Sequence, residues 1–450
     1  MQTSIIPQLR DTADGQEADR ILRACTHCGF CTATCPTYQL VGDERDGPRG
    51  RIYMIKQVLE GEEPTEKTQR HLDRCLTCRA CETTCPSGVE YAKLADIGRE
   101  LVDQKVQRPL PQRVLRWLLR HIVAYRNRFG FVFALGHFFK PLLVGPLAPL
   151  RQKMPPKQER IDWPQADNTQ RTMLVHDGCV QPVAAPNTNA HAARILSKLG
   201  VRLIAPKASG CCGALSQHLS HREEALDFAR ANIDAWWPHI EAGAEAIVIT
   251  ASGCGASVAE YGYMLRNDPV YADKAARVSE LTRDLSDVLA QEDLTALGDI
   301  GDGRKVAYHP PCTLQNAPGL HDNVAEILTQ AGYQLTHVQD PHLCCGSAGT
   351  YSILQPTMAN ELRDNKLASL NAGAPDVIVT ANIGCQLHLE AAAGIVQIAV
   401  TNMSYAVRQI TVEKGHDPRL FSLICIGGGG GLFAGSLLNE LEMKQAVVPQ

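Results

Sequence analysis

Two copies of one cysteine motif lie close together near the start of the chain. Each copy reads Cys-x2-Cys-x2-Cys-x3-Cys-Pro, and the cysteines are Cys25, Cys28, Cys31 and Cys35 in the first copy and Cys75, Cys78, Cys81 and Cys85 in the second. This spacing is typical of proteins that hold two [4Fe–4S] clusters. Three closely spaced thiolates can surround one cluster, while the proline turns the fourth cysteine away toward the other. The motif therefore predicts one cluster on Cys25, Cys28, Cys31 and Cys85, and a second on Cys75, Cys78, Cys81 and Cys35.

Structural zinc and disulfide bonds are the alternatives to iron for these eight cysteines. Zinc sites usually combine two separated Cys-x2-Cys pairs, whereas each copy here carries four cysteines in a single run. Disulfide frameworks belong mainly to short secreted chains, and this chain is long and shows no secretory signal. The agreement of the two copies, position by position, favours iron–sulfur clusters.

The composition fits metal binding in a reducing compartment. Of the 17 cysteines, sixteen fall into patterned sets. A formal net charge of −4 gives no reason to expect a nucleic-acid partner. No export signal is visible, and no window of about 18 uncharged apolar residues predicts a membrane-spanning helix. We therefore expect a cytoplasmic protein, with at most a peripheral contact on the inner face of the cytoplasmic membrane.

Residues 1–106 are expected to form a helical domain around the two motifs. Apolar residues recur at helical spacing after the first motif, and the 39 residues between Cys35 and Cys75 leave room for helices. The predicted helices cover 47–60, 65–74 and 87–106, after a helix or an irregular lead-in over 1–20. This pattern indicates an α-helical two-cluster ferredoxin domain.

Residues 107–170 are rich in arginine and proline, which predicts an extended connector between domains. Within it, residues 113–128 are basic and amphipathic, and the apolar stretch 129–150 is interrupted by Lys140 and three prolines. Two interpretations of this region stay open. It is either a helix that packs on a neighbouring domain or subunit, or a peripheral membrane contact near a quinone.

A second duplication, after residue 170, also concerns cysteines. Each copy has a single cysteine, then a Cys-Cys-Gly triplet, then a closing cysteine: Cys179, Cys211, Cys212 and Cys254 in residues 171–300, and Cys312, Cys344, Cys345 and Cys385 in residues 301–393. The interval from the single cysteine to the pair is 32 positions in both copies, and the interval from the pair to the last cysteine is 43 and 41. Two repeated domains are therefore expected, and we call them the first and second CCG domains.

Strands and helices alternate in both copies, which predicts an α/β fold with a parallel sheet in each. The expected strands are 172–176, 201–205 and 246–250, then 305–308, 333–338 and 377–380, with helices over 187–199, 225–236 and 324–331. The cysteines follow the carboxyl ends of strands, where open α/β sheets place their ligands. Gly213 and Gly346 are expected to allow a positive φ or a close backbone approach. The whole chain is thus a multidomain α+β and α/β protein.

Eight thiols at two sheet edges favour redox or metal chemistry over inert buried cysteines. These eight are our candidate cofactor-binding residues, and whether they hold a further cluster stays open. His309 is expected to be a packed histidine rather than a ligand. His27 and Arg79, inside the cysteine loops, either tune a cluster or are solvated.

Taken together, these segments resemble the family of glycolate oxidase iron–sulfur subunits. The resemblance covers about residues 1–393 and is carried by residues 27–53, 71–78, 232–237, 250–255, 343–351 and 380–386. It implies an electron-transfer subunit of a membrane-associated glycolate dehydrogenase. In that family, separate flavoprotein subunits bind FAD and oxidise glycolate to glyoxylate, and the iron–sulfur subunit carries electrons toward a quinone. No residue of this chain is then expected to be catalytic.

Three other functions are weighed against this one. The first is electron transfer for a lactate or glycerol-3-phosphate dehydrogenase. The second is a catalyst like heterodisulfide reductase, which would reduce a disulfide at the paired cysteines. The third is a zinc-stabilised scaffold.

The chain departs from the related patterns in two places. In heterodisulfide reductase the closing cysteine belongs to a Cys-x2-Cys pair, whereas the partner positions here hold Ala251 and Asn382. Each copy thus offers four cysteine ligands rather than five. Residues 394–450 leave the family and resemble a fragment of the hydantoinase/oxoprolinase large subunit, which we interpret as an atypical tail without a ligand.

Overall fold

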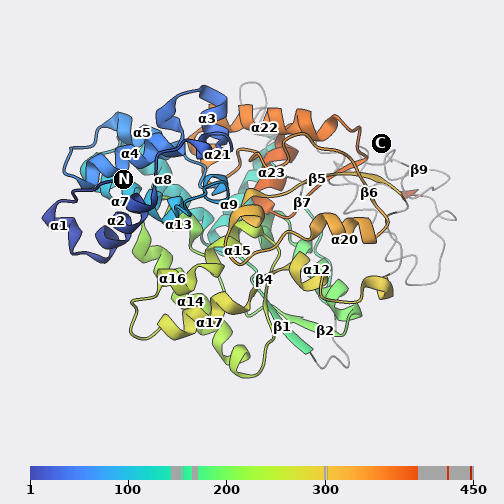
Figure 1. The fold of residues 1–450 in the computed structure, drawn as a ribbon. Helices are drawn as coiled ribbons and strands as arrows, with labels where there is room; N and C mark the ends of the chain where they lie inside the picture. The colour runs from blue at the N-terminus through green and yellow to red at the C-terminus, as the bar shows by residue number, and fades with distance from the viewer. Residues whose placement is uncertain are drawn as a thin grey trace.

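The computed structural model describes residues 1–142, 154–155, 157–164, 171–297, 301, 303–393, 423–424 and 446–447. Figure 1 shows a helical N-terminal part in blue, a green and yellow part below it, and an orange part at the top right. These three parts carry the two cysteine motifs, the first CCG repeat and the second CCG repeat. The atypical tail predicted over 394–450 lies outside the described residues, apart from the short strands β8 (Leu423–Ile424) and β9 (Ala446–Val447).

The N-terminal part is a bundle of helices, as the sequence predicts. Its elements are α1 (Pro7–Arg10), α2 (Ala13–Ala24), α3 (Pro36–Val41), α4 (Pro48–Leu59), α5 (Glu66–Asp73), α6 (Ala80–Thr83) and α7 (Tyr91–Lys105), with the 3-10 turns η1 (Phe30–Thr32) and η2 (Glu44–Asp46). Side chains that cap the helices fix several starts. The hydroxyl of Thr12 accepts from the amide of Gly15, and Thr65 and Thr68 form a capping box.

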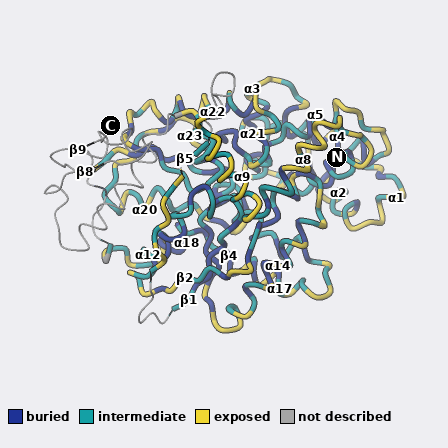
Figure 2. The backbone as a smooth tube through the Cα atoms, turned by 180° about the vertical axis from the view of Figure 1, so that it is seen from behind, coloured by how far each residue is buried: buried dark blue, intermediate teal, exposed yellow. Residues whose placement is uncertain are grey.

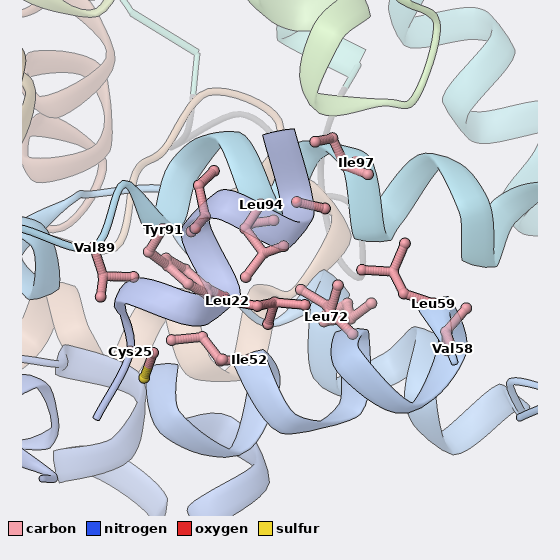
Figure 3. Close-up of a cluster of buried hydrophobic side chains, with 14 of the residues drawn as sticks. Leu22, Cys25, Ile52, Val58, Leu59, Leu72, Val89, Tyr91, Leu94 and Ile97 are labelled. Carbon is pink, nitrogen blue, oxygen red and sulfur yellow. The ribbon is translucent and has the colours of Figure 1, made fainter. Parts of the chain in front are cut away.

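One apolar core joins α2, α4, α5 and α7 (Figure 3). Leu22, Ile55, Leu59 and Leu94 are completely buried in it. Each such side chain contributes about 1.5–3 kcal/mol relative to exposure. Cys25, Cys81 and Cys85 pack against the same core, so the helices hold the cysteine loops in place.

The first part of the expected connector over 107–170 is not extended but forms the helices α8 (Leu110–Val123) and α9 (Arg126–Phe139), followed by η3 (Lys140–Leu142). Helix α8 agrees with the packed helix that was one interpretation of residues 113–128. Proline is tolerated at the start of α8 because its missing amide hydrogen needs no partner there. Arginines attach the two helices to the rest of the molecule: Arg116 to Asp73, Arg120 to Glu224 and Arg126 to Asp177.

The first CCG domain contains a parallel sheet with strand order β2-β1-β3-β4. Its strands are β1 (Arg171–Val175), β2 (Val201–Ile204), β3 (Ile247–Ile249) and β4 (Thr282–Asp284). The helices are α11 (Gln181–Ala184), α12 (Asn187–Lys198), α13 (Ala214–His218), α14 (Arg222–Glu241), α15 (Ser252–Ala259), α16 (Tyr261–Met264), α17 (Ala272–Leu281) and α18 (Leu285–Leu289), with η5 (Leu294–Leu297). The sequence did not predict β4, because Thr-Arg-Asp shows no apolar alternation.

The second CCG domain repeats this plan with fewer strands. Its parallel sheet has the order β6-β5-β7, formed by β5 (Lys305–His309), β6 (Gln334–Leu335) and β7 (Val377–Thr380). The helices are α19 (Cys312–Asn316), α20 (Val324–Gln330), α21 (Tyr351–Leu354), α22 (Pro356–Asn371) and α23 (Ile383–Ala393). The predicted fold class, a helical domain followed by two α/β repeats, is confirmed. The strand expected over 333–338 is shorter than predicted.

Candidate functional site

Two cavities in the helical domain collect the eight motif cysteines. Cys25, Cys28, Cys31 and Cys85 line the first cavity, and Cys35, Cys75, Cys78 and Cys81 line the second. Cys81 also borders the first cavity. The fourth cysteine of each motif therefore lies beside the other motif, which is the exchange that the sequence predicts.

Matching backbone conformations curl the two loops. His27 and Gly29 have positive φ angles of 59° and 91°, and Thr77 and Arg79, at the equivalent positions, have 54° and 61°. A positive φ is uncommon for residues other than glycine, so His27, Thr77 and Arg79 are strained, whereas Gly29 adopts this conformation freely. These backbone turns direct the cysteines of each motif inward.

Burial and nearby cations shape the ionisation of these thiols. Burial raises the pKa of Cys31 to about 11, and it also raises the pKa of Cys25, Cys78 and Cys81. Cys75 differs: burial opposes its ionisation, but Arg51 and Arg99 lower its pKa. Thiols with a raised pKa become good ligands when a metal ion displaces their protons.

A buried ionic network lies beside the second cavity. Asp46 is completely buried, and its carboxylate meets His71 Nδ1 at 2.9 Å, Arg74 at 2.8 Å and Arg51 at 3.6 Å. Arg51 also donates to the carbonyl of His71 at 2.8 Å. Asp43, Asp46 and His71 lie close enough to bind a metal ion, but the arginines already neutralise this group. This ionic network holds the loop of the second cysteine motif in position, because Arg51 binds the carbonyl of His71 shortly before Cys75.

Arg79 does not lie in solvent, contrary to one of the two expected alternatives. It is buried, and it pairs with Glu82 at 3.0 Å and with Glu260 of the first CCG domain at 2.6 Å. Arg79 therefore links the second motif to that domain. The ring of His27 stacks edge-on against Tyr53, and burial lowers its pKa.

In the first CCG domain, the four cysteines gather beyond the carboxyl ends of β1 and β3. Hydrogen bonds with Cys179 and Cys212 raise the pKa of Cys211, so these thiols are neighbours. Cys212, Cys254 and His176 place their ligand atoms within 4.8 Å of one another. Two hydrogen bonds hold the backbone of the paired cysteines: Asn232 donates to the carbonyl of Cys211 at 2.8 Å, and Tyr261 donates to the carbonyl of Cys212 at 2.9 Å.

The second CCG domain repeats this arrangement residue by residue. Cys312 and Cys344 lie 3.8 Å apart, measured between their sulfur atoms. Cys345, Cys385 and His309 form a group with ligand atoms within 4.8 Å. The Cys345 thiol and the nearby His309 ring lower the pKa of Cys385 to about 5. Asn382, which stands three residues before the closing cysteine where a further cysteine would complete a Cys-x2-Cys pair, donates to Cys385 Sγ at 3.4 Å.

The glycines of the two triplets have the positive φ expected from the sequence. Gly213 has φ +87° and Gly346 has φ +85°. In both copies the glycine amide donates to the sulfur of the first paired cysteine at 3.4 Å. A Cβ atom on Gly213 would lie 2.8 Å from the carbonyl oxygen of Ala225. The triplet therefore needs glycine for both its conformation and its close contact with α14.

Replacement of Gly213 with alanine should destabilise the first CCG domain by about 1–3 kcal/mol, the typical cost of one strained backbone position. The matched control is Gly210→Ala. A Cβ atom at this position meets nothing within 4 Å, and the hydrogen bond from the backbone amide of residue 210 to Asn232 is kept. Thermal unfolding of the full chain measures both variants. Equal melting temperatures for the two would contradict this role of Gly213.

Sequence reasoning did not connect His176 with His309, although each lies beside two cysteines of its own domain. Both lie three positions before the first cysteine of their copy, so the repeat reads His-x2-Cys in each domain. His176 was expected only as the end of a strand, and His309 as a packed residue. The same spacing in two copies was a signal that could have identified the pair.

The three cysteine-bearing parts meet at one junction. Leu76 of the second motif packs in one apolar cluster with Cys312, Cys344 and Met358, and Cys78 packs against that cluster. Asn316 donates to the carbonyl of Cys78 at 3.1 Å. The two CCG domains also touch, because the amide of Ser252 donates to the carbonyl of Ala381 at 3.2 Å. The second motif and both CCG sites are therefore connected through direct contacts.

Comparison with known proteins agrees with this division. Residues 21–89 match the family described as a 4Fe-4S dicluster domain, and residues 173–259 and 306–390 each match the family described as a cysteine-rich domain. The glycolate oxidase iron–sulfur subunit of Escherichia coli is 56% identical over 392 residues, which are 87% of this chain and 95% of that protein.

Two further relatives are more distant. The probable glycolate oxidase iron–sulfur subunit of Bacillus subtilis is 30% identical over 81% of this chain and 88% of its own length. The lactate utilization protein A of Bacillus licheniformis is 26% identical over 47% of this chain and 87% of its own length. The resemblance read from the motifs is confirmed: the chain belongs to the family of glycolate oxidase iron–sulfur subunits.

Proposed function

We propose that this chain is the electron-transfer subunit of a glycolate-oxidising complex. It receives electrons from a flavoprotein partner that binds FAD and converts glycolate to glyoxylate, and it delivers them toward a quinone-type acceptor. The observation that carries this proposal is the similarity to a glycolate oxidase subunit along 95% of that protein's length. The lactate utilization protein A matches only 47% of this chain, whereas the glycolate oxidase subunit matches 87%. This difference in coverage favours glycolate over lactate as the substrate of the complex.

The eight motif cysteines are the proposed ligands of two [4Fe–4S] clusters. Cys25, Cys28, Cys31 and Cys85 hold one, and Cys35, Cys75, Cys78 and Cys81 hold the other. The residues fit such groups, because each cavity offers at least four sulfur donors and no carboxylate lines either of them, a donor set that suits iron–sulfur clusters. Bound clusters of this kind accept and release single electrons. The protein orients the thiols, limits the access of water and places Arg51 and Arg99 beside Cys75.

The eight cysteines of the CCG domains form two further proposed cofactor sites. A thiol–disulfide catalyst would need access for its substrate, but six of the eight are buried and none is exposed. Their contact with the second motif instead favours a role in passing electrons onward. We propose the domain limits 1–106, 171–300 and 301–393 for these units, with 107–170 as the connecting region.

The test of this function is purification of the chain from its native host together with bound partners. Anaerobic preparations should contain a flavoprotein and should reduce a dye when glycolate is added. Reduction with lactate or glycerol 3-phosphate, but not with glycolate, would overturn the substrate. Stoichiometric zinc in place of iron would overturn electron transfer and favour the scaffold.

The helices α8 and α9 offer a surface for the partner subunit. Figure 2 draws α9 in teal and yellow, and no residue of α9 is buried. Trp117, Phe131 and Phe138 are exposed on the two helices, while Arg116, Arg120 and Arg126 turn to acidic residues of this chain. An apolar face on which three of the cations are already paired fits a protein partner better than an anionic membrane surface. No helix among the described residues is long and apolar enough to cross a membrane.

Replacement of Phe131, which is 69% exposed, with glutamate should weaken capture of the flavoprotein about 30-fold, because losing an aromatic anchor costs about 2 kcal/mol. The control is Val270→Glu, since Val270 is 66% exposed on the loop between α16 and α17. Pull-down titration measures both. If capture survives in Phe131→Glu, and the variant instead no longer binds quinone-containing vesicles, the helices are a peripheral contact on the inner face of the membrane.

A further inference from the structure

The two CCG domains contain a pair of equivalent histidines whose surroundings call for a partner. His176 is 3% exposed and His309 is 1% exposed. Among the described residues, no oxygen or nitrogen atom forms a hydrogen bond with either ring, and the rings instead interact with the thiols of Cys212 and Cys385. Buried polar groups in proteins are nearly always hydrogen-bonded, so the same exception at the same place in two copies requires an explanation.

Both rings are directed at sulfur. The ligand atoms of His176, Cys212 and Cys254 lie within 4.8 Å of one another, and those of His309, Cys345 and Cys385 do the same. Imidazole nitrogen and thiolate sulfur are common ligands of zinc and iron. A metal centre between them would satisfy the nitrogen that the protein leaves unpaired.

The donors at each site exceed what one tetrahedral ion needs. In the second CCG domain the row of sulfur donors continues from Cys345 to Cys344 and then, at 3.8 Å, to Cys312. In the first CCG domain the thiol of Cys211 interacts with the thiols of both Cys212 and Cys179, so the equivalent row runs from Cys212 to Cys211 and then to Cys179. Each domain therefore offers four sulfurs and one imidazole. A zinc ion would use four of these five donors, whereas an iron–sulfur cluster with several iron ions can use all of them.

The histidine also offers a fifth ligand in place of the cysteine that each CCG domain lacks. Ala251 and Asn382 occupy the positions where a fifth cysteine would stand, and neither supplies a thiolate. The imidazole comes from the neighbouring strand, at the end of β1 or β5. Histidine ligation of iron–sulfur clusters is chemically established, since it replaces cysteine on one iron in Rieske centres.

We propose that His176 and His309 are metal ligands, and that each completes an iron–sulfur site with the four cysteines of its CCG domain. The choice of iron rests on the proposed electron-transfer function. The second of these sites lies against the cluster loop of the helical domain, through Leu76 and Cys78.

The experiment uses the full chain, reconstituted anaerobically with ferrous iron and sulfide. Iron per chain should exceed the about eight that two [4Fe–4S] clusters require. In chain labelled with ¹⁵N-histidine, pulsed EPR of the reduced protein should show coupling to an imidazole nitrogen. His309→Ala should lose about half of the iron above eight and about half of that coupling. His309→Cys should keep the iron and lose the coupling, which separates ligand loss from misfolding.

His388 provides the matched control. It lies in the same domain, on α23, and its ring already has a partner in the carbonyl of Ala359 at 3.1 Å. His388→Ala should keep both iron and nitrogen coupling. About eight irons in the unsubstituted chain, a coupling unchanged in His309→Ala, or zinc in place of the extra iron would each overturn the proposal. Glycolate-dependent dye reduction is measured separately, so a failure of the proposed function can be distinguished from a failure of histidine ligation.

Discussion

Replacement of Cys78 with serine should remove one cluster, about four irons per chain, and should block glycolate-dependent dye reduction while the partner flavin is still reduced. Cys78 lines the second cavity and also packs against the group of buried apolar side chains that contains Cys312 and Cys344. It therefore belongs both to the ligands of one iron–sulfur cluster and to the junction with the second CCG domain. Changes beside a metal ligand typically cost 10–100-fold in affinity or activity. Loss of the ligand itself should therefore cost more than about 100-fold.

Iron analysis, visible absorbance and dye reduction in the assembled complex check this expectation. Cys425→Ser is a suitable control, because Cys425 is the one cysteine outside the patterned sets. It should keep the iron content and the rate. Full-rate dye reduction by Cys78→Ser would show that the second cluster is not on the required route.

The second large effect concerns stability. Asp46→Ala should destabilise the helical domain by about 3–5 kcal/mol, the cost of leaving a buried charge without its partner. Arg51 is almost completely buried, and removal of Asp46 leaves it without its nearby carboxylate and leaves the ring of His71 without an acceptor. Because Arg51 also holds the segment before Cys75 through the carbonyl of His71, the second cluster should be lost at a lower temperature.

The temperature at which visible cluster absorbance disappears measures this effect. Asp43→Ala is the matched control, since Asp43 is three residues away and pairs with the exposed Arg45 at 2.7 Å. Exposed pairs contribute little to stability, so its melting curve should follow that of the unsubstituted chain. Similar shifts in both variants would show that the buried network does not stabilise the second loop.

Sequence reasoning worked where a spacing carries the chemistry. The cysteine intervals predicted the grouping that the two cavities display and the duplicated α/β domains. It failed over α9, where an extended connector was expected, whereas the amphipathic pattern of 113–128 allowed a packed helix and α8 covers most of it. The position of Arg79 could not be predicted, because its partner Glu260 is 181 residues away in the chain. The equivalence of His309 and His176 was not predicted, because a single histidine gives little signal until its repeat is noticed.

The exchange of Cys35 and Cys85 between the two loops affects how the protein is made. The first cavity lacks a sulfur donor until Cys85 has left the ribosome, although its other three cysteines emerge more than 50 residues earlier. The second cavity is complete once Cys81 has emerged, and the first is complete when Cys85 follows a few residues later. A chain that ends before the second motif therefore completes neither set of four sulfur donors, and both loops would stay without metal as targets for quality control.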